Sequence, residues 1–513
     1  MSLVKTYCSA VQGIEATTIT VEVNAAKGAK FFLVGLPDNA VKESQQRIDA
    51  ALKNTGFRWP GKRITVNMAP ADIRKEGSAY DLAIAVGILA SSEQMSAKEL
   101  KNYLIMGELS LDGGLQPIKG ALPIAITAKK EGYKGIILPK VNAREAAIVE
   151  GLDVYGVESI KEVVDFLNED TKPEPTLVDI KREFYERLSQ SDLDFSDVKG
   201  QENIKRALEI AAAGGHNAIL IGPPGAGKTM LAKRIPTILP PMSIEEALET
   251  TKIHSVAGKL NRNDSLVTTR PFRSPHHTIS DVALVGGGGY PQPGEISLAH
   301  HGVLFLDELP EFKRTVLEVM RQPLEDRKIT ISRARMAVEY PASFMLIASM
   351  NPCPCGYYNH PEKDCVCSPG VVQRYLNKIS GPLLDRIDLH VEVTPVSFNE
   401  LSSERVTENS EQIRAKVIAA RSIQEERYKK SKDQHCNAQM TSKQLKSICK
   451  IDEAGKQILK NAVDRLGLSA RAYDRILKVA RTIADLDNSE NIQTHHLAEA
   501  IQFRSLDREN WAG

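Results

Sequence analysis

Hydrophobic and polar positions follow two different periods in the first part of the chain. Strand-like runs cover Thr18 to Val23, Phe31 to Leu33 and Ile64 to Asn67, as expected for short strands bounded by turn residues. Between them a helical pattern begins near Asp38, whose side chain is a favourable N-cap, and ends near Gly56. This alternation of strands and helices predicts an α/β region.

The same mixture continues to about residue 168. Tyr80 to Ala90 predicts a buried helix because it is almost wholly apolar, Leu122 to Glu131 predicts a second helix, and Gly135 to Leu138 predicts a short strand. Residues 169–195 are polar, with mixed charge and two prolines, which is typical of a linker between domains or of an isolated amphipathic helix. The first 168 residues are therefore expected to form one compact α/β domain.

Three apolar runs in the middle of the chain each end in polar residues. They are Ile219 to Ile221, Val303 to Leu306 and Phe344 to Ser349, and such runs are typical of strands buried in a parallel sheet. Doubly wound sheets of this kind bind ligands beyond the carboxyl ends of their strands. Past residue 395 the pattern becomes helical, with long segments at Asn409 to Lys430 and from Ser469 to about Leu486.

Composition and charge narrow the class of protein. The chain of 513 residues is 42% hydrophobic and 26% charged, which is ordinary for globular proteins and excludes a disordered one. Its 66 Lys and Arg nearly balance 65 Asp and Glu, so any nucleic-acid contact has to come from local placement of charge. The N-terminus lacks the apolar core of a secretory signal, and no run reaches membrane-spanning length. We therefore expect a cytoplasmic protein.

The first of the three middle runs leads directly into a phosphate-binding motif. Glycines in the turn let backbone amides approach an anion, and the following helix adds its positive N-terminal end. In the pattern G-x-x-x-x-G-K-T, Lys228 is expected to reach the β- and γ-phosphates and Thr229 to hold Mg²⁺. The nucleotide-binding residues that this pattern predicts are Gly222, Pro223, Pro224, Gly225, Ala226, Gly227, Lys228 and Thr229.

Two acidic residues follow the second apolar run. Asp307 is expected to orient Mg²⁺, and Glu308 is expected to align and deprotonate the attacking water. By themselves, two acids at the end of a strand are more often a solvated strand end. The phosphate loop upstream is what favours a catalytic role.

The segment Phe195 to Gln201, taken with these two motifs, resembles AAA+ ATPases. The resemblance implies that the nucleotide is ATP. It also implies that Asn351, which follows the third run, is a sensor 1 residue that holds the lytic water, although Asn351 is equally suited to a turn before Pro352. Arg471, at the start of a C-terminal helix, resembles sensor 2, which contacts the γ-phosphate and reports its loss as lid motion.

The segment Gly381 to Asp388 resembles the corresponding part of minichromosome-maintenance helicases and of the ATPase subunit of magnesium chelatase. The resemblance implies that Arg386 is an arginine finger, which stabilises the transition state in the site of a neighbouring subunit. The active enzyme would then be a ring. The alternative for Arg386 is an ion pair within the chain to Asp385 or Asp388, and Arg374 is a second candidate for the finger.

An insertion at residues 272–299 corresponds to the helix-2 insert of the same clade. It contains the adjacent residues His276 and His277, which suggest a metal site at first sight. Neighbouring side chains on an extended chain point in opposite directions. We therefore interpret both histidines as loop residues.

A second insertion, at residues 326–340, alternates as two short strands and resembles the pre-sensor-1 hairpin of ring helicases. Lys328, Arg333 and Arg335 are expected to contact DNA phosphates there, which supplies affinity without reading the bases. Contact with a neighbouring subunit is the alternative for a basic hairpin.

Four of the seven cysteines lie in two close pairs, Cys353 with Cys355 and Cys365 with Cys367. In a reducing compartment this arrangement favours a metal over disulfides, and four thiolates suit a tetrahedral structural Zn²⁺. His360 is a possible substitute for one thiolate. Free cysteines are the alternative, because C-x-C is less usual for zinc than C-x-x-C.

Part of the N-terminal domain resembles the C-terminal domain of Lon-type proteases, which has a ribosomal-S5-domain-2-like fold. The likeness, here named the Lon-like region, lies in residues 75–79, 107–110 and 117–120. Lon-type peptidases use a Ser nucleophile and a Lys base, but these positions correspond to Ala79 and Leu122 here. Ser78 is one residue away from the nucleophile position, and Lys75 and Lys119 are the remaining possible bases. We expect a scaffold without an intact peptidase dyad.

Together these features resemble the ComM/YifB family over nearly the whole chain. The resemblance implies an α/β multidomain protein with four parts. These are a Lon-like domain at residues 1–168, a linker at 169–195, an AAA+ core with a doubly wound parallel sheet at 196–395, and an all-α lid at 396–513.

The function that the resemblance implies is that of a hexameric, ATP-driven motor. Such a motor acts on single-stranded or branched DNA as a branch-migration helicase and helps to integrate incoming strands during natural transformation or recombination. Two alternatives remain open. One is a magnesium-chelatase-like motor for metal insertion or remodelling, and the other is an ATP-dependent Lon-like protease.

Overall fold

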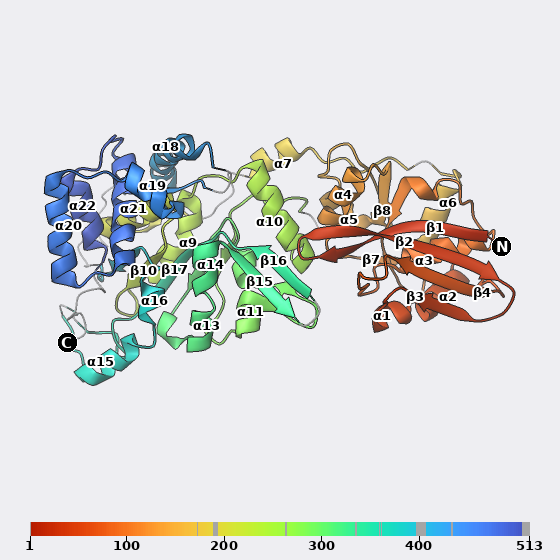
Figure 1. Cartoon of the computed structure of the whole chain (residues 1–513), viewed down its shortest axis with the longest axis horizontal. Coiled ribbons are helices and arrows are strands. Elements are labelled where there is room, and N and C mark those ends of the chain that lie inside the picture. The colour runs from red at the N-terminus through yellow and green to blue at the C-terminus, as the bar shows by residue number, and fades with distance from the viewer. Residues whose placement is uncertain are drawn as a thin grey trace. The chain divides into compact units, whose positions relative to one another are not determined.

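The computed structural model describes residues 2–171, 173–187, 193–261, 264–333, 336–358, 360, 362–396, 407–431 and 434–504. The chain divides into two compact units (Figure 1). The first comprises residues 1–188 and 243–268, and the second comprises residues 189–242 and 269–513. Within the described ranges, no helix is long and apolar enough to cross a membrane.

A mixed seven-stranded sheet forms the centre of the first unit. Its strand order is β3-β4-β2-β1-β5-β8-β9; β1 and β2 pair antiparallel, whereas β1, β5, β8 and β9 run parallel. The strands are β1 (Ser2–Gln12), β2 (Glu15–Ala26), β3 (Phe31–Val34), β4 (Arg63–Ala69), β5 (Tyr103–Ile105), β8 (Gly135–Pro139) and β9 (Asp153–Val157), with a separate pair β6 (Glu108–Leu109) and β7 (Leu115–Gln116).

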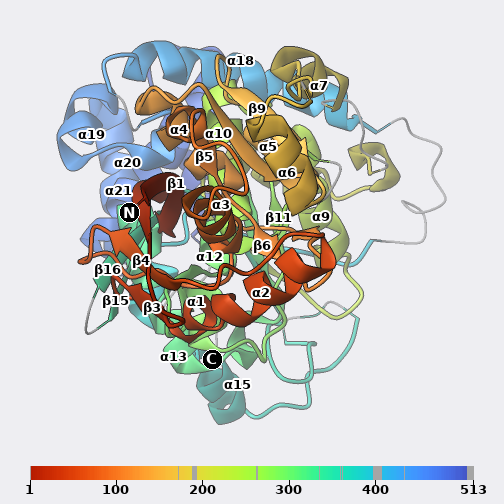
Figure 2. The ribbon, with the colours of Figure 1, turned by 90° about the vertical axis from the view of Figure 1, so that its right-hand side faces the viewer.

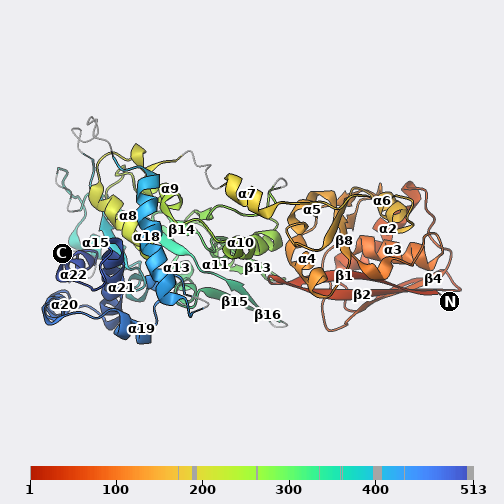
Figure 3. The same cartoon turned by 90° about the horizontal axis from the view of Figure 1, so that it is seen from above.

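Helix α3 (Asp81–Ser91) packs on β1 and β2, and α2 (Ser44–Asn54) packs on α3 (Figures 2 and 3). Every residue of α3 is buried, which explains its uniformly apolar sequence. A Cβ at Gly87 would lie 2.6 Å from Cγ2 of Val23, so glycine lets the helix approach the sheet closely. The other helices are α1 (Asn39–Lys42), α4 (Ala121–Lys130), α5 (Lys140–Ala146), α6 (Ile160–Leu167) and α7 (Ile180–Arg187).

Residues 243–268 lie within the predicted AAA+ core in sequence but belong to the first unit in the structure. Their helix α10 (Ile244–Ala257) packs against α4. The N–H of Gly120 donates to the Ser255 carbonyl (3.2 Å), and the Ser255 hydroxyl donates to the buried carboxylate of Glu145. Burial raises the pKa of Glu145. Polar bonds buried in this way tie α10 to the N-terminal helices, which a boundary drawn from sequence at residue 196 does not anticipate.

The second unit contains a parallel five-stranded sheet of order β11-β14-β17-β10-β18. The strands are β10 (Ala218–Ile221), β11 (Phe272–Arg273), β14 (Val303–Leu306), β17 (Met345–Met350) and β18 (Leu389–Glu392). Every residue of β10, β14 and β17 is buried. The three apolar runs of the sequence are therefore the three central strands.

Two small hairpins lie beside this sheet and contact each other. They are β12 (Gly286–Gly287) with β13 (Gln292–Pro293), and β15 (Lys328–Arg333) with β16 (Met336–Pro341). A Cβ at Gly286 would lie 2.7 Å from Cδ1 of Ile331, and the Tyr340 hydroxyl donates to the Pro291 carbonyl (2.9 Å). The helix-2 insert thus braces the pre-sensor-1 hairpin.

Helices complete the second unit. In Figure 3, α8 (Glu202–Gly214), α18 (Ser410–Tyr428) and α21 (Ala470–Leu486) lie side by side, and all three contact one another. Asn409 and Ser469 cap α18 and α21 at the predicted starts. The remaining helices are α9 (Lys228–Ile238), α11 (Asp281–Val285), α12 (Glu295–Leu298), α13 (Arg314–Glu318), α14 (Arg321–Asp326), α15 (Pro369–Leu376), α16 (Gly381–Leu384), α19 (Ser442–Ile448), α20 (Glu453–Leu466) and α22 (Thr494–Gln502).

Candidate functional site

The phosphate loop follows β10 at the carboxyl edge of the parallel sheet. The N–H of Gly222 donates to the Met350 carbonyl at the end of β17 (3.2 Å), which ties the loop to the neighbouring strand. Gly225 and Gly227 have φ values of 80° and 84°, in the left-handed region that glycine adopts without strain. The loop then enters the N-terminus of α9, where backbone amides and the helix dipole favour an anion.

The ammonium group of Lys228 lies over this loop. It donates to the carbonyls of Gly222 (2.7 Å) and Pro223 (2.9 Å) and to Oδ1 of Asn351 (3.1 Å). Burial lowers the pKa of Lys228, and the nearby acid Asp307 opposes this shift. A cation fixed by three neutral oxygens is well placed to meet phosphate oxygens.

Thr229 and Asp307 meet at the same edge of the sheet. The Thr229 hydroxyl donates to Oδ2 of Asp307 (2.9 Å), and the hydroxyl of Ser349 in β17 donates to Oδ1. A hydroxyl and a carboxylate are oxygen ligands of the kind that Mg²⁺ prefers. Ser349 was not singled out from the sequence, although a polar residue inside an apolar run is a signal that would have found it.

Glu308 adopts a left-handed backbone conformation, with φ of 53°. Such a conformation is strained for a residue other than glycine and often occurs at functional sites. Its N–H donates to Oδ1 of Asp307 (3.1 Å), and its side chain extends toward Nδ1 of His277, 3.7 Å from Oε2. The carboxylate is therefore placed beside Asp307, the acid predicted to hold Mg²⁺.

His277 comes from the loop after β11, the strand next to β14. The prediction that His276 and His277 are loop residues agrees with the structure, but the expected opposite orientation is wrong. Their rings lie 4.1 Å apart between centroids, because the chain turns here and the N–H of Ile279 donates to the His276 carbonyl (3.0 Å). Sequence reasoning missed the contact between His277 and Glu308.

Arg386 does not make either of the ion pairs considered from sequence. Its Nη2 lies 2.7 Å from Oε1 of Glu325, its Nη1 donates to the Pro382 carbonyl (2.5 Å), and the residue is only 5% exposed. Glu325 and Arg386 both line a cavity of about 550 Å³. Arg386 is thus held by its own chain rather than extended into solvent.

Asp388 anchors the same segment to α21. Oδ1 of Asp388 lies 3.1 Å from Arg475, and Oδ2 accepts from the Asn217 N–H (3.0 Å) and contacts Nδ1 of His216 (3.3 Å). Burial raises the pKa of Asp388, but Arg475 and His216 outweigh burial and hold it below its ordinary value. The carboxylate therefore stays ionised at neutral pH and fixes the start of β18.

Known proteins are similar in sequence to this chain over nearly its whole length. Family models match at residues 194–401 (Magnesium chelatase, subunit ChlI), 21–142 (Subunit ChlI of Mg-chelatase) and 407–504 (Magnesium chelatase, subunit ChlI C-terminal). The chain is 47% identical to Competence protein ComM of Haemophilus influenzae over 512 residues, which cover 99% of this chain and 98% of that protein. The chain belongs to the ComM/YifB family.

Two further relatives match the chain, one over nearly its whole length and one over part of it. YifB of Escherichia coli is 46% identical over 516 residues, covering 99% of this chain and 98% of that protein. Lon protease 2 of Bacillus subtilis is 33% identical over 159 residues, covering 28% of this chain and 27% of that protein. The predicted family, and the α/β fold with a Lon-like part and an AAA+ core, are confirmed.

This member of the ComM/YifB family brings its four predicted cysteine ligands together. The sulfurs of Cys353, Cys355, Cys365 and Cys367 lie within 4.8 Å of one another. Three of the separations are 3.2, 3.5 and 3.7 Å, close to the roughly 3.8 Å edge of a tetrahedron with Zn–S bonds of about 2.3 Å. Nδ1 of His360 accepts two backbone N–H bonds, so the cysteines form the better ligand set.

The basic hairpin keeps the predicted strand pairing. Lys328 lies at its base, where its ammonium is 2.9 Å from Oε2 of Glu339, so part of the expected positive charge is neutralised within the hairpin. Of Arg333 only the backbone is described, and Arg335 lies outside the described residues. The structure thus leaves these two arginines as predicted DNA contacts.

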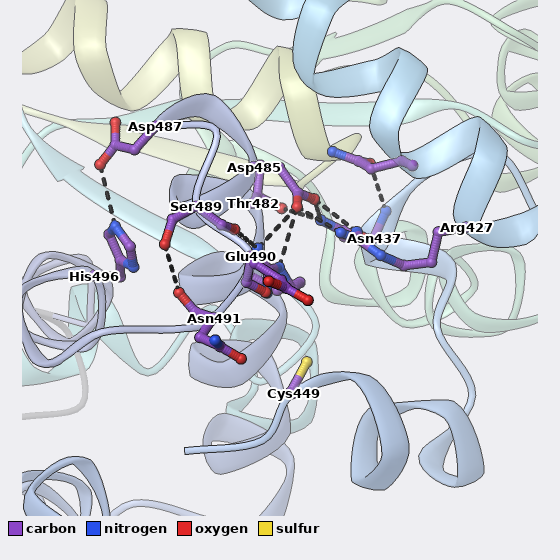
Figure 4. Close-up of polar contacts among 12 residues, drawn as sticks. Arg427, Asn437, Cys449, Thr482, Asp485, Asp487, Ser489, Glu490, Asn491 and His496 are labelled. Atoms are coloured by element: carbon purple, nitrogen blue, oxygen red, sulfur yellow. Dashed lines mark hydrogen bonds and ion pairs between the residues drawn. The ribbon is translucent and has the colours of Figure 1, made fainter. Parts of the chain in front are cut away.

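Arg471 lies exposed in the first turn of α21, and the buried polar contacts of this helix come from later residues. Figure 4 shows Asp485 accepting from Arg427 (2.6 and 2.7 Å) and Asn437 (2.8 Å). Asn437 also donates to Thr482 (3.1 Å), which contacts Nε2 of His216 (2.8 Å). This chain of hydrogen bonds joins the lid to the loop before β10.

A second cluster in Figure 4 is not suited to a metal. Asp487, His495 and His496 lie close together, and Figure 4 shows Asp487 beside His496. Nδ1 of His496 accepts from the Gln493 N–H (3.0 Å), and burial lowers the pKa of His496. The proton of the neutral ring therefore sits on Nε2, 3.2 Å from Oδ2 of Asp487, and leaves no lone pair for an ion.

The polar residues of the Lon-like region do not form a nucleophile and base pair. The Ser78 hydroxyl donates to the carboxylate of Glu108, and the fully buried Lys75 donates to the Pro70 carbonyl. Leu122, at the lysine position, is also fully buried. These groups make structural hydrogen bonds instead.

Proposed function

We propose that this protein hydrolyses ATP in a ring of identical subunits and uses the energy to move on DNA. The observation that carries the proposal is the meeting of Lys228, Thr229, Asp307 and Asn351 at one sheet edge, in a chain similar over its full length to a competence protein. Lys228 binds the phosphates and Thr229 and Asp307 hold Mg²⁺, which orients the triphosphate. Glu308 takes the proton of the attacking water.

Asn351 and Arg471 act as the two sensors in this proposal. Asn351 already shares a hydrogen bond with Lys228 (3.1 Å), so it lies where it can position the water near the γ-phosphate. Arg471 contacts the γ-phosphate once the nucleotide is bound. Because α21 is tied to the start of β18 through Arg475 and Asp388, movement at Arg471 is passed to the segment that carries Arg386.

Arg386 completes the site of the neighbouring subunit. Its partner within the chain is Glu325, whose side chain is 43% exposed, so a triphosphate presented by a second copy can compete for the guanidinium group. The ring, most simply a hexamer, is then a condition for hydrolysis.

The DNA is gripped by the hairpin of β15 and β16. Arg333 and Arg335 contact phosphates, which gives binding without sequence preference. Single-stranded or branched DNA is the substrate, and branch migration during natural transformation or recombination is the activity. The name of the Haemophilus relative, a competence protein, supports the link to natural transformation. Four cysteines hold a structural Zn²⁺.

The test compares ATP hydrolysis with no DNA, single-stranded DNA and forked DNA, and follows the extension of three-strand intermediates. We expect hydrolysis to rise with DNA and extension to require ATP. A Lys228→Ala protein that still extended the intermediates would refute the motor. Arg333→Ala with Arg335→Ala should weaken DNA binding and reduce its salt dependence while basal hydrolysis stays.

A second candidate is a remodelling or metal-insertion ATPase, favoured by the match of residues 194–401 to the magnesium chelatase subunit model. It predicts hydrolysis that is indifferent to DNA and is stimulated by a protein partner. The same hydrolysis measurements separate the two candidates.

A further inference from the structure

The four-cysteine loop begins where the nucleotide site ends. Asn351, whose Oδ1 accepts from Lys228 (3.1 Å), directly follows β17, and Cys353 comes two residues later and is fully buried. Only Pro352 separates a residue of the nucleotide site from the first sulfur. A displacement of Cys353 therefore moves Asn351 as well.

The loop also touches the phosphate loop directly. Gly356 has φ of 85°, and its N–H closes a turn with the Cys353 carbonyl (3.0 Å). A Cβ at this position would lie 2.4 Å from Cδ and 2.9 Å from Cγ of Pro224, closer than non-bonded carbon atoms pack. The turn from Cys353 to Gly356, which contains the first two cysteines, thus lies against the proline ring at the centre of the phosphate loop.

The sulfur cluster therefore adjoins the proposed ATP site at two places. One is Asn351, which bonds to Lys228, and the other is Pro224 in the phosphate loop. The second pair of cysteines lies ten or more residues further along the chain, and the sulfur of Cys365 comes within 3.5 and 3.7 Å of the first pair. A metal bound by all four sulfurs would cross-link the two pairs. Without a metal, no cation balances the negative charge of the thiolates. The turn at Gly356 also loses its cross-link to Cys365 and Cys367.

We propose that the metal held by the four cysteines sets the shape of the phosphate loop, so that nucleotide affinity depends on metal occupancy. The inference rests on the proposed ATP and zinc sites. The metal holds the turn at Gly356 against Pro224 and keeps Asn351 beside Lys228. Its loss relaxes both contacts at once. The site is therefore one in which a bound Zn²⁺ controls ATP binding without touching the nucleotide.

The first experiment uses the full-length protein. Metal content is measured by plasma mass spectrometry, the metal is displaced with an organomercurial thiol reagent, and thiols and Mg²⁺ are then restored. Binding of a non-hydrolysable ATP analogue is measured by calorimetry before displacement, after it, and after Zn²⁺ is added back. We expect affinity to fall by about tenfold, within the usual range for coupled sites, and to recover with Zn²⁺.

A second experiment leaves the sulfurs in place. In Gly356→Ala the added methyl group pushes on the Pro224 ring and alanine is also strained at φ of 85°, so we expect weaker analogue binding with a full complement of metal. The part of the loss that comes from the ring contact is the part that removal of the ring restores. The double variant Gly356→Ala with Pro224→Ala lacks the ring atoms that the methyl group meets, so part of the affinity should return. Gly370→Ala is the control, because a Cβ there meets nothing within 4 Å. Thermal unfolding checks that each variant is folded.

The outcomes separate this inference from the proposals on which it rests. A wild-type protein that binds no analogue refutes the ATP site, and a protein that binds no metal refutes the zinc site. Metal that can be removed and replaced with no change in analogue affinity overturns the coupling. Wild-type affinity in Gly356→Ala, or equal losses in Gly356→Ala and Gly370→Ala, overturns the contact with Pro224 as its route.

Discussion

The nucleotide site and the Lon-like region both carry residues that resemble catalytic groups, but they differ in what those groups contact. At the nucleotide site, Lys228 and Asn351 share a hydrogen bond, and Thr229 bonds to Asp307. In the Lon-like region, Ser78 bonds to Glu108 rather than to a lysine. Sequence similarity therefore indicates the fold in both regions. Only at the nucleotide site do the candidate functional groups contact one another.

The physical reason for the difference is the need to satisfy buried polar groups. Leu122, at the lysine position, is fully buried and offers no base. The hydroxyl of the half-buried Ser78 donates to the carboxylate of Glu108 instead, as polar groups withdrawn from water generally find a partner. At the nucleotide site the polar groups are satisfied by other residues of the site, as Lys228 is by Asn351 and Thr229 is by Asp307.

The largest effect is expected from Arg386, which we propose completes the nucleotide site of a neighbouring subunit. Arg386→Ala should reduce ATP hydrolysis by about 10³-fold or more, because the finger stabilises transition-state charge, while analogue binding changes little. Glu325 is partly exposed, so losing its partner should not unfold the protein. Steady-state hydrolysis and analogue titration check both parts.

Mixing variants sharpens the same test. Arg386→Ala subunits keep an intact phosphate loop, and Lys228→Ala subunits keep the finger, so mixed rings should recover part of the activity that each lacks alone. Hydrolysis per subunit should also fall on dilution. A rate per subunit that does not depend on protein concentration would contradict a shared site.

Lys228→Ala should reduce hydrolysis by about 10²-fold to 10³-fold, the usual loss when one group that stabilises charge is removed. Lys233→Ala is the matched control, because Lys233 lies in the same helix α9 and is exposed. Equal losses in the two variants would mean that net charge, and not the position over the loop, is what matters.

A smaller effect is expected from His277 in the helix-2 insert, whose Nδ1 lies 3.7 Å from Oε2 of Glu308. His277→Ala should lower kcat by about fivefold, equivalent to about 1 kcal/mol, with KM for ATP unchanged, and His277→Gln should restore part of the rate. His276→Ala is the control because His276 bonds to Thr278 (2.9 Å). Equal loss in His276→Ala would assign the effect to loop structure.

The sequence predicted those parts of the fold and site that depend on local pattern. Apolar runs marked β10, β14 and β17, and the motif after β10 marked the phosphate loop. Strand β1 was missed because polar Thr6 faces the core, where it donates to the Ala83 carbonyl (2.9 Å), and so hides the alternation.

Contacts between residues that are distant in the sequence could not be predicted from it. Glu325 with Arg386, His277 with Glu308, and Pro224 with Gly356 are each set by how elements pack, and no local spacing encodes them. Packing also joined residues 243–268 to the first unit. The individual site residues were therefore predictable, whereas the partners that hold them were not.

The smallest effect on catalysis is expected from Ser78. Ser78→Ala should leave ATP hydrolysis unchanged and create or remove no peptide hydrolysis, but should lower the free energy of unfolding by about 1 kcal/mol through the lost hydrogen bond to Glu108. As a control, Ser442→Ala, at an exposed serine, should change it by less than about 0.5 kcal/mol. Denaturant unfolding and a labelled casein assay with ATP provide the measurements.

The combination of results is what identifies the role of this serine. A nucleophile needs a base that takes its proton, yet the proton of Ser78 is directed to Glu108 and the ammonium of Lys75 to the Pro70 carbonyl. Casein degradation that Ser78→Ala abolished would show that these bonds rearrange when peptide binds, and the contrast with the nucleotide site would fail. A change in unfolding with no change in either hydrolysis makes Ser78 a structural residue and leaves the ATP site as the catalytic centre.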